Sequence, residues 1–177
     1  MVHPTELVAH YEATDAATRD AGREWYPNAL ALCQAIGGDA VPVDTVARVM
    51  ALLSPRVSWK WCVEWTRVIV EAYLAGLPIP AVSTMGNRMK AWSELHGEPA
   101  ISGQKVTAFA RAILGDTEAV VIDSWVLRSV GLKPEAKVTR FRQRWITSAY
   151  TEAASLAGET PRDMQAIVWC AIRGASA

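Results

Sequence analysis

The sequence has few of the residues that build metal sites and disulfide frameworks. Its three cysteines, Cys33, Cys62 and Cys170, lie far apart and lack the paired spacing of a zinc, iron–sulfur or disulfide motif. Its three histidines are equally scattered along the 177 residues. We therefore expect no metal, no cofactor and no disulfide.

Long apolar runs are also lacking. None approaches the roughly 18 residues that would suggest a membrane-spanning helix, and the first stretch, MVHPTELVAHYEATD, is too polar and acidic for a signal peptide. No repeat or low-complexity segment interrupts a chain in which 51% of residues are hydrophobic and 20% are charged. These features are typical of one folded domain, residues 1–177, for which we expect no membrane partner, a cytoplasmic location and a monomeric state.

The charge is balanced overall but unevenly distributed. The 18 basic and 18 acidic side chains cancel, which argues against a simple electrostatic clamp on nucleic acid. The densest basic stretch, RSVGLKPEAKVTRFRQR (128–144), nevertheless sets six cations against Glu135 alone. It is either a solvated helix face or a phosphate-contacting patch in which Arg140, Arg142 and Arg144 hold DNA.

Helical patterns cover almost the whole chain. Glycine and proline stops and polar N-caps predict helices over residues 5–14, 21–37, 45–54, 58–76, 84–97, 104–115, 123–131, 138–158 and 160–174. We expect Asp44, Asp123 and Thr160 to cap three of them. The only strand-like run, Ala119–Ile122, is too short to build a sheet, so the pattern predicts an all-α, bundle-like fold.

Eight tryptophans are many for this length. Trp59, Trp61 and Trp65 cluster at the start of one predicted helix, and such a cluster is more often core than a platform for stacking bases. We expect core. Trp125, two residues after Asp123, is a better candidate for function.

Three segments follow one another in an informative order. MALLSPRVSWKW is a helix end that turns at Ser54-Pro55-Arg56, and MGNRMKAWSEL is a short helix with the pair Lys90-Ala91. ISGQKVTAFARAILG then leads to VIDSWVLRSVG, which places Asp123 eighteen residues after Lys105 and Arg128 five residues later. Over residues 45–132 this succession resembles the helix-hairpin-helix DNA glycosylase superfamily. Residues 1–44 and 133–177 match it only as helical packing, and the whole chain resembles a group of small, divergent phage proteins related to that superfamily.

The resemblance implies an all-α glycosylase fold that acts on a damaged or modified base flipped out of double-stranded DNA, in a bacterial or phage-infected cell. Asp123 would be the catalytic carboxylate and Lys105 an amine nucleophile that forms a Schiff base. A flipped base needs side chains that stack on it and read its edge, and Trp125, Gln165 and Trp169 are the candidates. The remaining DNA contacts that we expect are Ser54, Arg56, Lys90, Gly103, Gln104, Arg128, Arg140, Arg142 and Arg144.

This sequence also departs from the family pattern. Ile101 stands where the first of two hairpin glycines would be, and only Gly103 remains. Arg56 replaces a glutamine that can fill the gap left by an extruded base, and the four-cysteine cluster of some members is absent. The hairpin is therefore the weakest part of the match.

The chemistry needs such residues because cleavage of an N-glycosidic bond develops positive charge on the sugar, which a carboxylate in a dry site stabilises. Asp123 could equally be no more than a helix cap, and Lys105 a surface lysine. Three functions therefore stay open: base excision with or without strand cleavage, hypermodification of thymine in phage DNA, and DNA binding without catalysis.

Overall fold

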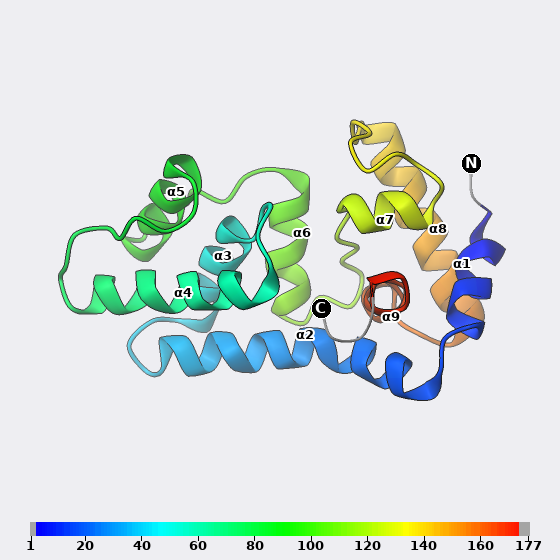
Figure 1. Ribbon diagram of the computed structural model, residues 1–177, viewed down its shortest axis with the longest axis horizontal. Helices are drawn as coiled ribbons and strands as arrows, with labels where there is room; N and C mark the ends of the chain where they lie inside the picture. The colour runs from blue at the N-terminus through cyan, green and yellow to red at the C-terminus, as the bar shows by residue number, and fades with distance from the viewer. Residues whose placement is uncertain (1–2, 174–177) are drawn as a thin grey trace. The chain divides into compact units, whose positions relative to one another are not determined.

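The computed structural model describes residues 3–173, and within them the chain is all-helical, without a β-strand (Figure 1). The prediction of an all-α fold is confirmed. The helices are α1 (Pro4–Glu12), α2 (Ala16–Gly37), α3 (Val43–Leu53), α4 (Trp59–Leu74), α5 (Met85–Leu95), α6 (Gln104–Ile113), α7 (Ser124–Ser129), α8 (Arg140–Ala157) and α9 (Pro161–Arg173).

The described chain divides into two compact units. Unit 1 comprises residues 3–27 and 115–173, and unit 2 comprises Asn28–Leu114. Helix α2 contributes to both, with Pro27 inside the helix at the division.

In unit 1, α8 and α9 build most of the core. Helix α8 buries Ile146, Ala149, Tyr150, Ala153 and Ala154, which follow the three- and four-residue spacing of one helix face. These residues pack with Leu7 of α1, with α9, and with the apolar residues of the segment 120–130. The side chains that line the helix interfaces are thus the ones that the periodicity places inside.

Helices α2 and α9 approach each other closely within unit 1. A Cβ atom added at Gly22 would lie 2.6 Å from the Cα atom of Ile167. Real Cβ atoms do not come that close to backbone, so this crossing requires glycine.

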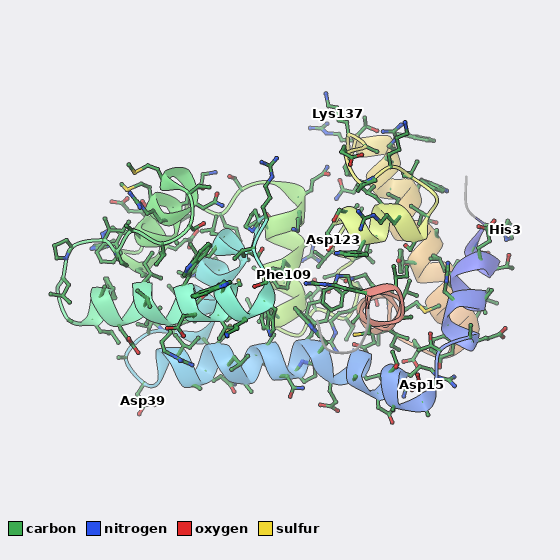
Figure 2. The ribbon with its side chains drawn as sticks, viewed as in Figure 1. His3, Asp15, Asp39, Phe109, Asp123 and Lys137 are labelled. Atoms are coloured by element: carbon green, nitrogen blue, oxygen red, sulfur yellow. The ribbon has the colours of Figure 1, made fainter. Side chains whose placement is uncertain are left out.

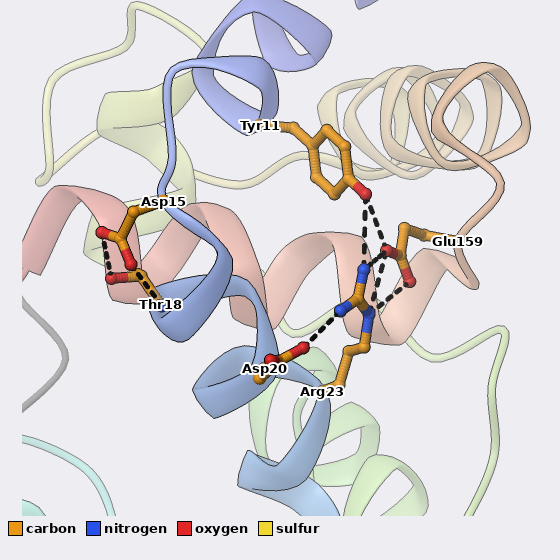
Figure 3. A network of polar contacts seen from close by, with 6 residues as sticks. All are labelled: Tyr11, Asp15, Thr18, Asp20, Arg23 and Glu159. Atoms are coloured by element: carbon orange, nitrogen blue, oxygen red, sulfur yellow. Dashed lines mark hydrogen bonds and ion pairs between the residues drawn. The ribbon is translucent and has the colours of Figure 1, made fainter.

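A polar network joins α1, α2 and the turn between α8 and α9 (Figure 3). The Arg23 Nη2 atom lies 2.6 Å from Glu159 Oε1, and Nη1 lies 2.7 Å from Asp20 Oδ1. The Tyr11 hydroxyl donates a hydrogen bond to the same Glu159 oxygen at 2.9 Å. Hydrogen bonding to Glu159 raises the pKa of Arg23, so the guanidinium stays charged.

In unit 2, α3 is the central element. It buries Val46, Ala47, Val49, Met50, Ala51, Leu52 and Leu53 and contacts α4, α5 and α6. The predicted N-cap at Asp44 is wrong, because α3 starts two residues earlier, with Pro42 as its N-cap. Asp44 lies in the first turn instead and pairs with Arg48 at 2.8 Å.

The tryptophan cluster of α4 is only partly core. Helix α4 buries the face that carries Cys62, Thr66, Ile69 and Val70. Trp61 lies off this face and is 52% exposed, so the expectation that it is core is wrong. Among residues 3–173, no helix combines the length and apolar character needed to cross a bilayer.

Candidate functional site

Asp123 stands where a buried apolar segment meets a helix of unit 1. Residues 119–122 are all at least nine-tenths buried, and α7 begins immediately after Asp123. The Asp123 Oδ1 atom accepts hydrogen bonds from the backbone N–H groups of Trp125 and Val126, both at 2.9 Å. The predicted cap is confirmed, and it fixes the orientation of the carboxylate.

The second carboxylate oxygen of Asp123 has no hydrogen-bond partner among residues 3–173. The charge also acts on two buried phenols: burial raises the pKa of Tyr26 and Tyr150, and the Asp123 carboxylate raises both further. Their hydroxyls bond instead to Gln165 Oε1 at 2.8 Å and to Ser129 Oγ at 2.7 Å. Asp123 itself is half-buried, so a carboxylate at the edge of the core keeps one oxygen available for a developing cation.

The two tryptophans predicted to read a base share one arginine. The Arg173 Cζ atom lies 4.8 Å from the ring centroid of Trp169 and 5.9 Å from that of Trp125. Arg128, one turn after Trp125 on α7, lies 4.4 Å from the Trp125 ring centroid in a cation–π contact. A base stacked on that face of Trp125 would therefore displace the Arg128 guanidinium.

Gln165 lies inside unit 1. Only 4% of the residue is exposed, and its Oε1 atom accepts the hydroxyl of Tyr26. Trp169, one turn further along α9, is half-buried and packs edge-on against Trp25 at 5.6 Å. The Gln165 oxygen thus already has a partner inside the protein. To recognise a base, it would have to bond to Tyr26 and to the base at the same time.

Lys105 belongs to unit 2, whereas Asp123 belongs to unit 1. Lys105 is half-buried in the first turn of α6. Burial raises the pKa of the neighbouring Cys62 thiol to about 12, and the Lys105 charge acts weakly in the opposite direction. This lysine is therefore close to the apolar core of its own unit.

Four of the five other predicted DNA contacts of unit 2 lie at two helix ends. Ser54 ends α3 and its hydroxyl donates to the Ala51 carbonyl at 2.9 Å, and exposed Arg56 has a positive φ of 61°. Gly103 is the N-cap of α6, with a φ of 90°, and the exposed Gln104 is the first residue of that helix. Lys90 of α5 donates to Ser102 Oγ at 2.9 Å, which connects that helix to the segment before Gly103.

A carboxylate that the sequence analysis missed organises this segment. Glu94 is 4% exposed, and its Oε1 atom accepts the backbone N–H groups of Ala100 and Ile101, each at 2.7 Å. Its Oε2 atom accepts from Arg48 Nε at 2.8 Å. The amides beside Ile101 are thus satisfied inside the protein. The signal for this clamp was an acid on the apolar face of α5, three residues after buried Ala91.

The basic stretch runs from the end of α7, through the connecting segment, to the start of α8. Thr139 caps α8 by accepting the N–H of Arg142, and the Arg142 guanidinium donates to the Lys137 carbonyl at 2.7 Å. Arg140 and Arg144 are exposed, as is Lys137. Figure 2 shows Lys137 at the margin of unit 1, with nitrogen-bearing side chains around it.

No group of three potential metal ligands occurs among residues 3–173. An open hollow of about 280 Å³ is lined by His10, Asp15, Thr18 and Cys170, among others. Because burial raises the pKa of Cys170, its thiol is protonated at neutral pH and is a poor nucleophile.

One family model matches nearly the whole chain. It is described as a family of unknown function, DUF7178, and it matches residues 3–176. No curated protein and no solved structure matches the chain.

Proposed function

We propose that this chain, which belongs to the DUF7178 family, is a DNA-binding enzyme of the helix-hairpin-helix glycosylase type that acts on a base displaced from the duplex. Asp123 is its catalytic carboxylate. The observation that carries the proposal is that two backbone amides hold one oxygen of Asp123 while the other has no partner among the described residues. A carboxylate fixed in this way can stabilise a cationic sugar without first reorganising.

Two further features support the proposal. Trp125, Trp169 and Arg173 place flat side chains in the same unit as Asp123, which is what recognition of a flipped base requires. The exposed cations at the start of α8 provide phosphate contacts in that unit. Lys105 is the proposed amine for a Schiff-base step, and modification of the base in place of its excision is the same proposal with a different product.

A second candidate function, DNA binding without catalysis, is favoured by the same cap. Two N–H bonds to one oxygen give Asp123 a complete structural role. The two candidate functions predict different effects of a neutral side chain at position 123: only the catalytic one predicts a loss of activity.

The test compares Asp123→Asn with the wild type on duplexes that carry a panel of damaged and modified bases. Products are followed by gel assay, borohydride trapping and nucleoside mass spectrometry, which separate a free base from an altered nucleoside. Because asparagine also caps helices, we expect the free energy of unfolding to change by about 1 kcal/mol or less. We expect product formation to fall by about 100-fold or more, as for removal of an electrostatic stabiliser.

Glu118→Gln is the matched control, since Glu118 is an exposed carboxylate of the same unit, and it should keep full activity. Full activity in Asp123→Asn would exclude Asp123 as the catalytic group. A wild-type protein that binds DNA but yields neither product nor trapped adduct across the panel would establish the non-catalytic function. A trapped adduct that persists in Lys105→Gln would exclude Lys105 as the amine.

A further inference from the structure

Unit 1 exposes an aromatic side chain among cations. Phe141, the second residue of α8, is 66% exposed. Arg140 precedes it, and Arg144 follows one turn later on the same side of the helix. We call the exposed residues of this region the α8 tip: Lys133, Lys137, Arg140, Phe141 and Arg144.

The backbone that carries the α8 tip is held in place. Ala136 and Val138, on either side of Lys137, pack against the core of unit 1. The Arg142 guanidinium bonds to the Lys137 carbonyl, and Thr139 caps the helix. The side chains of the tip therefore project from a defined scaffold.

The fold does not account for the charges of the α8 tip. Among residues 3–173, none of its four cations forms an ion pair with a carboxylate. No acidic residue lies in the first turn of α8, and arginines close to a helix N-terminus meet the positive end of the helix dipole. Arg140 lies in that first turn, where its charge weakens its own helix, and a partner of opposite charge would offset this cost.

We infer that the α8 tip binds an unpaired nucleic acid strand, with its arginines and lysines on the phosphates and Phe141 stacked on a base. Single-strand binding sites combine a cationic track with aromatic side chains in this way, because every base offers a flat face for stacking. The inference takes from the proposed function only that the partner is DNA. It adds that the DNA bound by unit 1 has an unpaired strand.

An anionic membrane is a weaker match for the same surface. A helix that lies on a bilayer buries a continuous apolar face. The next exposed positions of α8 beyond Phe141 are Arg144 and Ser148, both polar. One aromatic ring among cations suits a stacked base better than an acyl layer.

The experiment uses fluorescence anisotropy at two salt concentrations. It measures binding of a fluorescein-labelled oligothymidine strand of about 20 nucleotides, a length that spans at least one single-strand site, and of a fully paired duplex of that length. We expect Phe141→Ala to weaken binding of the single strand by about 5- to 150-fold, the range for removal of one stacked base. Phe141→Trp should retain binding. Both variants should bind the duplex within about twofold of the wild type, because duplex bases are not free to stack on a side chain.

Two variants serve as controls. Leu156→Ala removes an equally exposed apolar side chain, 63% exposed, from the other end of the same helix, and it should bind like the wild type. Arg140→Ala combined with Arg144→Ala should weaken binding of both strand and duplex. For the single strand, it should also reduce the salt dependence of log Kd by about 0.7 for each phosphate that a cation no longer neutralises.

Wild-type affinity for the single strand in Phe141→Ala would overturn the inference and leave the proposed function standing. Binding of phosphatidylserine vesicles that depends on Phe141, without binding of the strand, would also overturn it. Conversely, strand binding that depends on Phe141 supports the inference even if the wild type never yields a processed base, an outcome that would overturn the proposed function alone.

Discussion

Glu94 determines what the segment before α6 can do. Its carboxylate accepts the amides of Ala100 and Ile101 and also the Arg48 side chain, all from within unit 2. The resemblance to helix-hairpin-helix proteins would assign such hairpin amides to a DNA phosphate. In this protein the Glu94 carboxylate, and not a phosphate, accepts these two amides. This part of the segment therefore helps to hold α3, α5 and α6 together.

At the same scale, Glu94→Gln should destabilise the protein by about 2 kcal/mol. The glutamine oxygen can still accept the two part-buried amides, but its NH2 group would face the Arg48 guanidinium, which keeps only its Asp44 partner. Urea unfolding followed by tryptophan fluorescence measures the change. Glu98→Gln, at an exposed position of the same segment, should shift stability by about 0.5 kcal/mol or less. A destabilisation below about 1 kcal/mol in Glu94→Gln would show that the clamp is replaceable.

At the scale of elements, two helical glycines provide opposite expectations. Alanine at Gly22 must push α2 away from Ile167 of α9, so we expect unit 1 to be destabilised by about 1–3 kcal/mol despite the better helix propensity of alanine. Alanine at Gly86 in the first turn of α5 meets nothing within 4 Å and should stabilise by up to about 1 kcal/mol. Thermal unfolding of both variants measures the pair, and a stabilising Gly22→Ala would contradict the close approach.

The same scale shows what the sequence could predict. Apolar periodicity and glycine stops located each helix, because those signals are local. Helix α2 starts five residues before the predicted position. The Asp15 carboxylate caps this start by accepting two hydrogen bonds from Thr18, and apolar periodicity does not reveal such a cap. Asp44 was misplaced for a related reason: an acid in a first turn and an acid at an N-cap look alike until the partner, here Arg48, is known.

Prediction of the site was limited by long-range partners. The cap at Asp123 could be predicted because its local pattern, an apolar run followed by a helix, is visible in the chain. Other contacts join residues that are far apart in the sequence and meet only on folding. They are the cation–π contact between Arg173 and Trp125 and the hydrogen bonds Tyr26–Gln165 and Ile101–Glu94. The spacing of Lys105 and Asp123 matched a family motif, but the two residues belong to different units.

At the scale of the whole molecule, buried thiols and phenols make the protein less stable at alkaline pH. Burial raises the pKa of Cys33 and Cys62 from 9.0 to about 12, and it also raises the pKa of Tyr26 and Tyr150. Below pH 9 the folded and unfolded chains hold the same thiol protons, so this contribution to stability is complete. Between pH 9 and 12 the unfolded chain releases protons that the folded chain keeps, so stability falls.

We therefore expect the free energy of unfolding to decrease above pH 9, by up to about 1.4 kcal/mol per pH unit for each such thiol. Urea unfolding at about pH 8, 9 and 10 measures this slope. Cys33→Ala combined with Cys62→Ala removes these two thiols and should reduce the slope, leaving the part that Cys170, Tyr26 and Tyr150 contribute. A slope unchanged by that pair of substitutions would mean that the thiols already ionise in the folded protein.

Unit 2 is an insertion in the sequence of unit 1, since residues 28–114 lie between Pro27 and Gly115. This order has a consequence during synthesis. Helix α1 leaves the ribosome early, but α8 and α9, which cover its Leu7, are made only after the whole of unit 2. At about 5–20 residues per second, the apolar face of α1 waits for several seconds without its partners. Unit 2 can complete its core before translation ends, whereas unit 1 closes only when α9 emerges.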